Sequence, residues 1–152
     1  MNRVGAMETQ TTYPPIKLFD LHGRRALVTG ARRGIGRAIA EALAAQGAAV
    51  AVHHAPADEE HRDAQDVLAT ITGRGGAAQA FAADFSMAGT GAELTADVEK
   101  RLGPIDILVL NASIEILEPG EQVTPEHFER QIAITLRAPL ELLKAILPGM
   151  KQ

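Results

Sequence analysis

The chain has 152 residues, of which 46% are hydrophobic and 22% are charged, and it carries a formal net charge of −4. This length and apolar content predict one globular domain with a single core. A negative net charge without a basic stripe argues against general nucleic-acid binding. The absence of cysteine excludes disulfides and thiolate chemistry, and no apolar stretch approaches the roughly 20 residues that span a bilayer. We expect a cytoplasmic protein that does not enter membranes, with a polar N-terminal tail at residues 1–20 and one folded unit at residues 21–152.

Strand and helix signals alternate along the chain after the tail. Short apolar runs predict strands, and apolar residues at three- and four-residue spacing predict helices. Asp58 is expected to cap the second helix. In chain order, the expected elements are a strand at 25–29, a helix at 34–46, a strand at 48–52, a helix at 58–73, a strand at 77–83, a helix at 91–102, a strand at 105–110 and a helix from Thr124-Pro125 onward.

The helical spacing also predicts which faces are buried. The first helix should bury Ile35, Ile39, Ala42 and Leu43,. In the last helix, Pro139 should introduce a kink, because proline removes a backbone donor and collides with the preceding turn. The apolar face expected for this last helix consists of Phe128, Ile132, Leu136, Leu140, Leu143 and Leu147.

Four strands separated by helices predict an α/β fold with a parallel sheet that is covered on both faces. Right-handed crossovers give a Rossmann-type doubly wound sheet in the order 3-2-1-4. Because such folds contain a second half, we expect this sequence to carry an incomplete one.

The connection between the first strand and the first helix is rich in glycine. It reads Thr29-Gly30-Ala31-Arg32-Arg33-Gly34-Ile35-Gly36. Glycine allows the backbone to approach a ligand closely, and the N–H groups of the first helical turn have no partner within the helix. Together with the helix dipole, these donors favour an anion. The turn therefore predicts a site for the phosphates of a nucleotide cofactor.

Three segments carry a family resemblance. They are the glycine turn, Asp84-Phe85-Ser86 after the third strand, and Leu110-Asn111-Ala112-Ser113 after the fourth. In this order and spacing they resemble the classical short-chain dehydrogenases/reductases. The resemblance covers about Leu18 to Met150 and only the N-terminal, cofactor-binding half of that family's domain.

The resemblance implies roles for several residues. Gly30, Gly34, Ile35 and Gly36 would hold the cofactor's pyrophosphate, and Asp84 would accept a hydrogen bond from adenine beside the backbone of Phe85. Asn111, Ala112 and Ser113 would line the cofactor, with Ser113 standing where the family usually has glycine.

Charged residues around the turn favour NADP over NAD. Arg32 and Arg33 carry guanidinium groups that pair with phosphate oxygens. NAD-binding folds usually place an acid after the second strand to hold the ribose 2′-OH, whereas this chain has Val52-His53-His54-Ala55. These two histidines read as solvent-facing loop residues. Both could donate hydrogen bonds to a 2′-phosphate, and His54 is the one placed among the expected cofactor-binding residues.

The family's acid–base residues, a Tyr-x-x-x-Lys pair and a serine, have no counterpart in this sequence. Tyr13 and Lys17 have the spacing, but Pro14-Pro15 prevents a helical turn between them,. Thr135 stands where the family has an asparagine that organises a proton relay, although a helix-interior threonine bonded to its own backbone is the simpler interpretation. No metal site is predicted, because His22, His61 and His127 lack ligand spacing,.

The sequence therefore predicts the cofactor-binding half of an NADP-dependent oxidoreductase that acts on an alcohol or carbonyl. The resemblance implies a homo-oligomer for the complete protein and an inactive 152-residue chain on its own. Two alternatives remain open: a non-catalytic dinucleotide-binding module and, less favoured, a methyltransferase with a similar sheet. A methyltransferase would want a denser glycine loop and an acid after the second strand, and this chain has neither.

Overall fold

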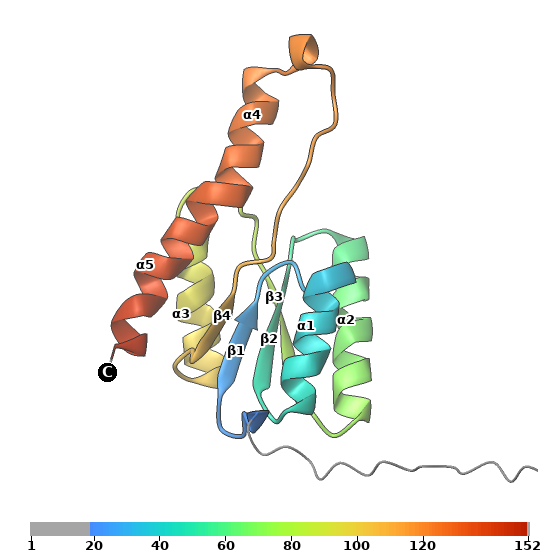
Figure 1. The fold of residues 1–152 in the computed structure, drawn as a ribbon, viewed down its shortest axis with the longest axis vertical. Coiled ribbons are helices and arrows are strands. Elements are labelled where there is room, and N and C mark those ends of the chain that lie inside the picture. Colours follow the sequence, from blue (N-terminus) through green and yellow to red (C-terminus); the bar gives the residue numbers. More distant parts are fainter. Residues whose placement is uncertain (1–18, 152) are drawn as a thin grey trace, which may run out of the picture.

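The computed structural model describes residues 19–151, and a four-stranded parallel sheet forms its centre (Figure 1). The strands are β1 (Arg25–Val28), β2 (Ala49–His54), β3 (Ala77–Ala82) and β4 (Ile107–Val109). Their order across the sheet is β3-β2-β1-β4, with Val28 opposite both Val52 and Val109. The predicted Rossmann-type topology is confirmed. All of the predicted N-terminal tail except Phe19 and Asp20 lies outside the described residues, as do Tyr13 and Lys17.

Helices cover both faces of the sheet (Figure 1). On one side lie α1 (Gly34–Ala45) and α2 (Asp58–Gly73). On the other lie α3 (Thr90–Leu102) and α5 (Ala138–Met150), which continues from α4 (Pro125–Ile132) through a π-helical segment, η3 (Ala133–Arg137). A short 3₁₀ turn, η2 (Gly120–Gln122), precedes α4. Among the described helices, none is long and apolar enough to cross a membrane.

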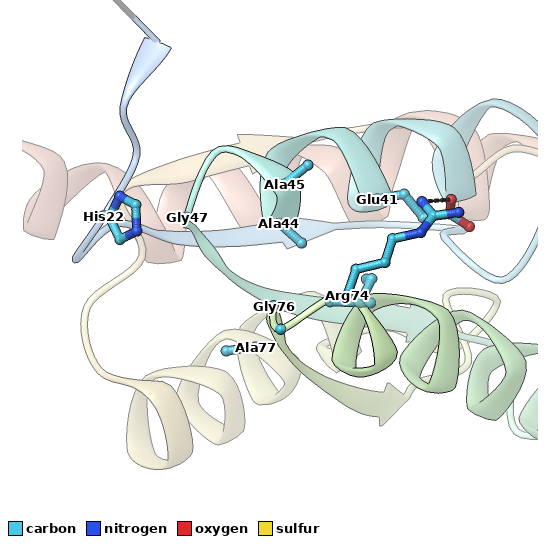
Figure 2. Close-up of a pocket in the computed structure, with 10 residues that line it drawn as sticks. His22, Glu41, Ala44, Ala45, Gly47, Arg74, Gly76 and Ala77 are labelled. Atoms are coloured by element: carbon cyan, nitrogen blue, oxygen red, sulfur yellow. Dashed lines mark hydrogen bonds and ion pairs between the residues drawn. The ribbon is translucent and has the colours of Figure 1, made fainter. Parts of the chain in front are cut away.

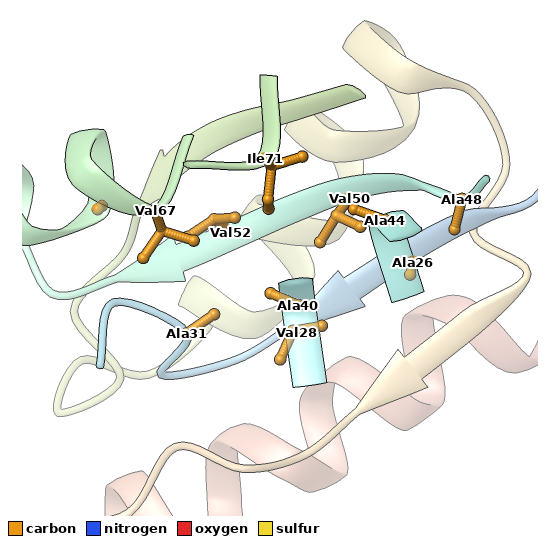
Figure 3. Packing of buried hydrophobic residues seen from close by; sticks show 11 residues of the cluster. Ala26, Val28, Ala31, Ala40, Ala44, Ala48, Val50, Val52, Val67 and Ile71 are labelled. Carbon is orange, nitrogen blue, oxygen red and sulfur yellow. The ribbon is translucent and has the colours of Figure 1, made fainter. Parts of the chain in front are cut away.

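Alternation along the strands separates the core into two layers. Val28, Val50 and Val52 point toward α1 and α2, whereas Leu27 and Ala51 point toward α3 and α5,. Figure 3 shows the first layer, in which branched strand residues meet Val67 and Ile71 of α2. Both faces of the strands are therefore apolar, as expected of a parallel sheet covered on both sides.

The buried face of α1 differs from the one predicted. Gly36, Ala40 and Ala44 are buried, Ile39 and Leu43 are half-buried, and Ala42 and Ile35 are exposed, Ile35 by 75%. Small residues on this face let the helix lie close to the sheet. A Cβ on Gly36 would stand against the carbonyl oxygen of Gly30 and 2.5 Å from Nδ2 of Asn111.

The end of β2 and the start of α2 also differ from the prediction. β2 continues through His53 and His54, which are buried strand residues rather than solvent-facing loop residues. Asp58 is the first residue of α2 and not its cap, which is Ala57. Asp58, Glu59 and Glu60 instead place three acids in the first turn, where the helix dipole favours them,.

The predicted apolar face of the last helix is exposed. Its buried residues are Ala133, Ala138, Leu142 and Ile146. Pro139 lies at the start of α5, directly after η3, and α4 and α5 run on in nearly the same direction (Figure 1). In place of the kink predicted at Pro139, the structure has a π-helical segment directly before α5. The residues that remain exposed are Phe128, Ile132, Leu136, Leu140, Leu143 and Leu147.

Candidate functional site

The segments that follow the four strands meet at one edge of the sheet and enclose a pocket of about 450 Å³. Ligands of doubly wound folds bind at this edge, where the crossovers from a central pair of strands diverge. Here β1 and β4 are that pair, because β1 leads to α1 on one face and β4 leads to the other. The pocket is lined by all of the residues predicted to bind the cofactor: Gly30, Arg32, Arg33, Gly34, Ile35, Gly36, His54, Asp84, Phe85, Asn111, Ala112 and Ser113.

The glycine turn brings an uncapped helix end to this pocket. Gly30 and Gly34 have φ of +62° and +56°, a conformation that residues with a Cβ rarely adopt,. The N-cap residue of α1, Arg33, makes no side-chain cap, and the first turn contains no acid. A Cβ on Gly34 would meet nothing within 4 Å. With no side-chain cap, the N–H groups of the first turn have no partner within the helix, and the helix dipole makes this end favourable for an anion,.

Thr29 and Asn111 fix the turn against the segment after β4. The Thr29 hydroxyl donates to the Val109 carbonyl (3.2 Å) and accepts from the backbone N–H groups of Asn111 (2.9 Å) and Ala112 (3.0 Å). The Asn111 side-chain amide donates to the carbonyls of Thr29 (3.0 Å) and Gly30 (3.1 Å). Asn111 thus holds the shape of the glycine turn, a role that its position in the sequence did not reveal.

His53 joins the turn to the end of β3. Its Nδ1 accepts from the Gly30 N–H (3.0 Å), and its Nε2 lies 3.1 Å from the Ala83 carbonyl, so Nε2 carries the proton,. The ring stacks on Phe85 with centroids 4.2 Å apart. Burial lowers the pKa of His53 to about 4,. A neutral imidazole therefore connects the phosphate turn to the predicted adenine wall.

The second histidine is buried as well. His54 lines the pocket but is only 2% exposed. Its Nδ1 lies 2.7 Å from the Ala55 carbonyl, and its Nε2 lies 3.4 Å from Nδ1 of His61. Both ring nitrogens thus face other groups of the protein, and donation to a 2′-phosphate stays a prediction.

The two arginines of the turn have different surroundings. Arg32 is paired with Glu60 (3.3 Å) and Asp63 (2.5 Å) of α2. Arg33 is exposed and forms no ion pair with any residue from 19 to 151. Residues 55–57, between β2 and α2, contain no acid, but Glu60 reaches the pocket from the first turn of α2. The sequence does carry a signal for Glu60, because three acids stand in the first turn of the helix that follows β2.

Asp84 and Phe85 follow β3 at the pocket wall. Hydrogen bonds from Ser86, including one from its backbone N–H (2.9 Å), lower the pKa of Asp84, so this carboxylate is ionised and able to accept further bonds,. Phe85 is buried under the His53 ring. The lining residues that the sequence did not predict are His53, Ala55, Glu60, Ala83, Ile114, Arg130 and Ile134.

Thr135 does not line the pocket. It is exposed within η3, and its neighbour Ile134 lines the pocket instead. In the described part of the chain, no group of three or more His, Asp or Glu residues has the arrangement of a metal site.

A smaller pocket of about 270 Å³ lies at the opposite end of the sheet, between residues that precede β1, β2 and β3 (Figure 2). Its charged groups are already paired, because the Glu41 carboxylate binds Arg37 (2.7 Å) and Arg74 (3.2 Å). These arginines, with the Arg37 hydrogen bond foremost, lower the pKa of Glu41. The remaining lining is mostly alanine and glycine, which offers little chemistry.

Comparisons with curated proteins identify relatives among reductases. A hydroxynaphthalene reductase-like protein of Metarhizium majus is 38% identical over 119 residues, which cover 78% of this chain and 43% of that protein. A fatty acyl-CoA reductase of Mycobacterium tuberculosis is 38% identical over 140 residues, which cover 90% of this chain and 46% of that protein. The chain thus spans less than half the length of these relatives.

Solved structures agree with this relationship. A 3-oxoacyl (acyl-carrier-protein) reductase from Agrobacterium tumefaciens with NADP bound matches with a TM-score of 0.82 and 39% identity, covering 95% of this chain and 54% of the other. A blue fluorescent protein from a metagenomic library in complex with NADPH matches with a TM-score of 0.81 and 34% identity, covering 86% and 53%. The family model for short chain dehydrogenases matches residues 24–152. With its glycine turn, strand order and relatives in agreement, the chain belongs to the short-chain dehydrogenase/reductase family.

Proposed function

We propose that this chain supplies the cofactor-binding half of an NADP-dependent oxidoreductase, which transfers hydride between the nicotinamide ring and an alcohol or carbonyl substrate. One observation carries the proposal: the uncapped N-terminus of α1 opens onto a pocket lined by glycine, arginine and the ends of all four strands. Such an end attracts phosphate. The pocket's volume lies in the range of small-molecule sites,.

The residues present fit an adenine dinucleotide. The N–H groups of Gly34, Ile35 and Gly36 would hold the diphosphate, and Asp84 and Phe85 would hold the adenine. When bound, NADP supplies the hydride donor or acceptor. Asn111 and His53 would support binding indirectly by holding the glycine turn in shape. Asn111 donates to the Gly30 carbonyl, and His53 accepts from the Gly30 N–H.

The preference for NADP rests on Arg33, whose exposed guanidinium is available to a 2′-phosphate. Relatives support it, since the structures of the Agrobacterium tumefaciens reductase and of an angucycline C-6 ketoreductase contain bound NADP. The ketoreductase matches this chain with a TM-score of 0.77 and 39% identity. The names of the relatives, which are reductases, favour reduction of a carbonyl group.

Replacing Arg33 with alanine tests this assignment in the full gene product. Loss of one charge-assisted phosphate contact should weaken NADPH binding roughly tenfold to a hundredfold and leave NADH binding nearly unchanged. Fluorescence titration of both reduced cofactors measures the two affinities. Arg62→Ala, which removes an exposed arginine outside the pocket, is the matched control. Equal losses for NADPH and NADH would contradict the preference.

A second candidate, a non-catalytic dinucleotide-binding module, is favoured by the position of Thr135. The residue at the family's proton-relay position is exposed and lies outside the pocket lining. Turnover of a carbonyl or alcohol by the gene product would exclude this candidate. Tight NADPH binding without turnover of any alcohol or carbonyl tested would favour it.

A further inference from the structure

The adenosine side of the pocket contains an acid that opposes its arginines. Glu60, in the first turn of α2, lines the same pocket as Arg32 and Arg33. Its Oε2 accepts a hydrogen bond from the Ala55 N–H (2.9 Å) and faces Nε of Arg32 (3.3 Å). These contacts hold the carboxylate at the end of β2, where the ribose of the proposed cofactor would lie.

Arg32 is occupied by acids rather than available to a ligand. Its side chain is 16% exposed, and Asp63 holds its other end through Nη1 at 2.5 Å. Two carboxylates thus surround one guanidinium, and the charge of this group is more than neutralised. Arg33 remains as the unpaired cation among the described residues of the turn.

The second oxygen of Glu60 has spare capacity. No described residue donates a hydrogen bond to its Oε1. An ionised carboxylate accepts hydrogen bonds but donates none. It can therefore accept a ribose 2′-OH, whereas a 2′-phosphate brings like charge against it.

We propose that Glu60 determines how strongly this site discriminates between a 2′-phosphate and a 2′-hydroxyl on the cofactor's ribose. This inference rests on the proposed function, since it concerns the same pocket. Glu60 acts in two ways: its charge repels the 2′-phosphate, and its ion pair keeps Arg32 away from it. Arg33 acts in the opposite direction, so the two side chains together set the balance between NADP and NAD.

The test compares Glu60→Gln with the wild-type full gene product, using adenosine 2′,5′-bisphosphate and 5′-AMP as probes. These nucleotides differ only in the 2′-phosphate and occupy the adenosine half alone. Glutamine keeps an oxygen that accepts from the Ala55 N–H, so the local fold is retained,. The ratio of the two dissociation constants, measured by calorimetry, should shift about tenfold toward the bisphosphate.

Glu59→Gln is the matched control. It removes the same charge from the same helical turn, but Glu59 is exposed and does not line the pocket. An unchanged ratio in Glu60→Gln, or an equal shift in both variants, would overturn the role of Glu60 while leaving the cofactor site intact. If the wild-type protein binds neither these nucleotides nor NADPH, the proposed function itself fails and this inference with it.

Discussion

His53 shows how one residue can join the ends of three strands through its ring and its backbone. Its ring bonds Gly30 after β1 and Ala83 after β3, and its carbonyl accepts from the Ala31 N–H at 2.9 Å. Because Nδ1 is already an acceptor and the ring is 3% exposed, protonation would break the bond to Gly30 and bury a charge,. The glycine turn therefore depends on a neutral imidazole.

This dependence predicts a loss of stability in mild acid. The pKa of His53 is about 4 in the folded protein, against 6.5 for an unperturbed histidine. Between these values the unfolded chain binds a proton that the folded protein does not. The contribution of His53 is thus fully present above about pH 6.5 and is lost as the pH falls toward 4, at up to about 1.4 kcal/mol per pH unit,.

Denaturant unfolding at several pH values measures this slope. His53→Gln replaces the ring with an amide that cannot titrate and can still accept from Gly30, so its slope between pH 6.5 and 4 should be shallower by one proton. Parallel slopes in His53→Gln and wild type would show that another group causes the acid sensitivity.

At the scale of elements, the junction of β1 with α1 allows almost no additional volume. Gly36 faces the Gly30 carbonyl and the Asn111 amide, which themselves bond each other at 3.1 Å. A methyl group there would separate α1 from the segment after β4. The same close packing that shapes the phosphate turn also makes the turn sensitive to substitution.

Gly36→Ala should therefore destabilise the protein by about 1–3 kcal/mol, the usual cost of overpacking, and weaken NADPH binding. Gly73→Ala is the matched control, because a Cβ at this position in α2 meets nothing within 4 Å and alanine is the better helix former,. Thermal unfolding and NADPH titration measure both effects. Equal stability and affinity in the two variants would contradict the close packing derived for Gly36.

The order of these elements was predictable from sequence because strand and helix periodicities differ and glycines mark the turns. The contacts between elements were harder to predict from the sequence. β2 extends through His53 and His54 because the site, rather than an apolar pattern, buries them. The pairing of Arg32 with Glu60 and Asp63 depends on how α2 lies beside the turn, which no local pattern specifies.

The last helix shows a further limit of periodicity. The predicted apolar face took residues 128 to 147 at regular α-helical spacing, with a kink expected at Pro139. A π-helical turn adds one residue, which rotates the following helix by about 100° and changes the face that meets α3,. This shift accounts for the residues after η3, where Leu142 and Ile146 are buried. It does not apply to Phe128 and Ile132, which precede η3 and belong to α4, a helix without buried residues.

At the scale of the whole molecule, the last helical segment exposes large apolar side chains, which we call the apolar stripe. They are Phe128, Ile132, Leu136, Leu140, Leu143 and Leu147. Leu136 and Leu140 are 63% and 57% exposed, and Leu147 is 41% exposed. Large apolar side chains that are exposed together on one helical segment indicate an interface. The stripe supports our prediction, made from the family resemblance, that the complete protein is a homo-oligomer.

Leu140→Lys tests this prediction, because a lysine at the centre of the stripe would place a charge in the interface, where its desolvation is costly. Light scattering coupled to size exclusion should show an oligomer for the wild-type gene product and a smaller particle for the variant. Leu117→Lys is the control, since Leu117 is 84% exposed and precedes the last helix rather than lying on the stripe. A monomeric wild-type protein, or an oligomer that withstands Leu140→Lys, would contradict self-association through this stripe. In the second case the subunits would have to meet through another surface, and the stripe would then face a different part of the same protein.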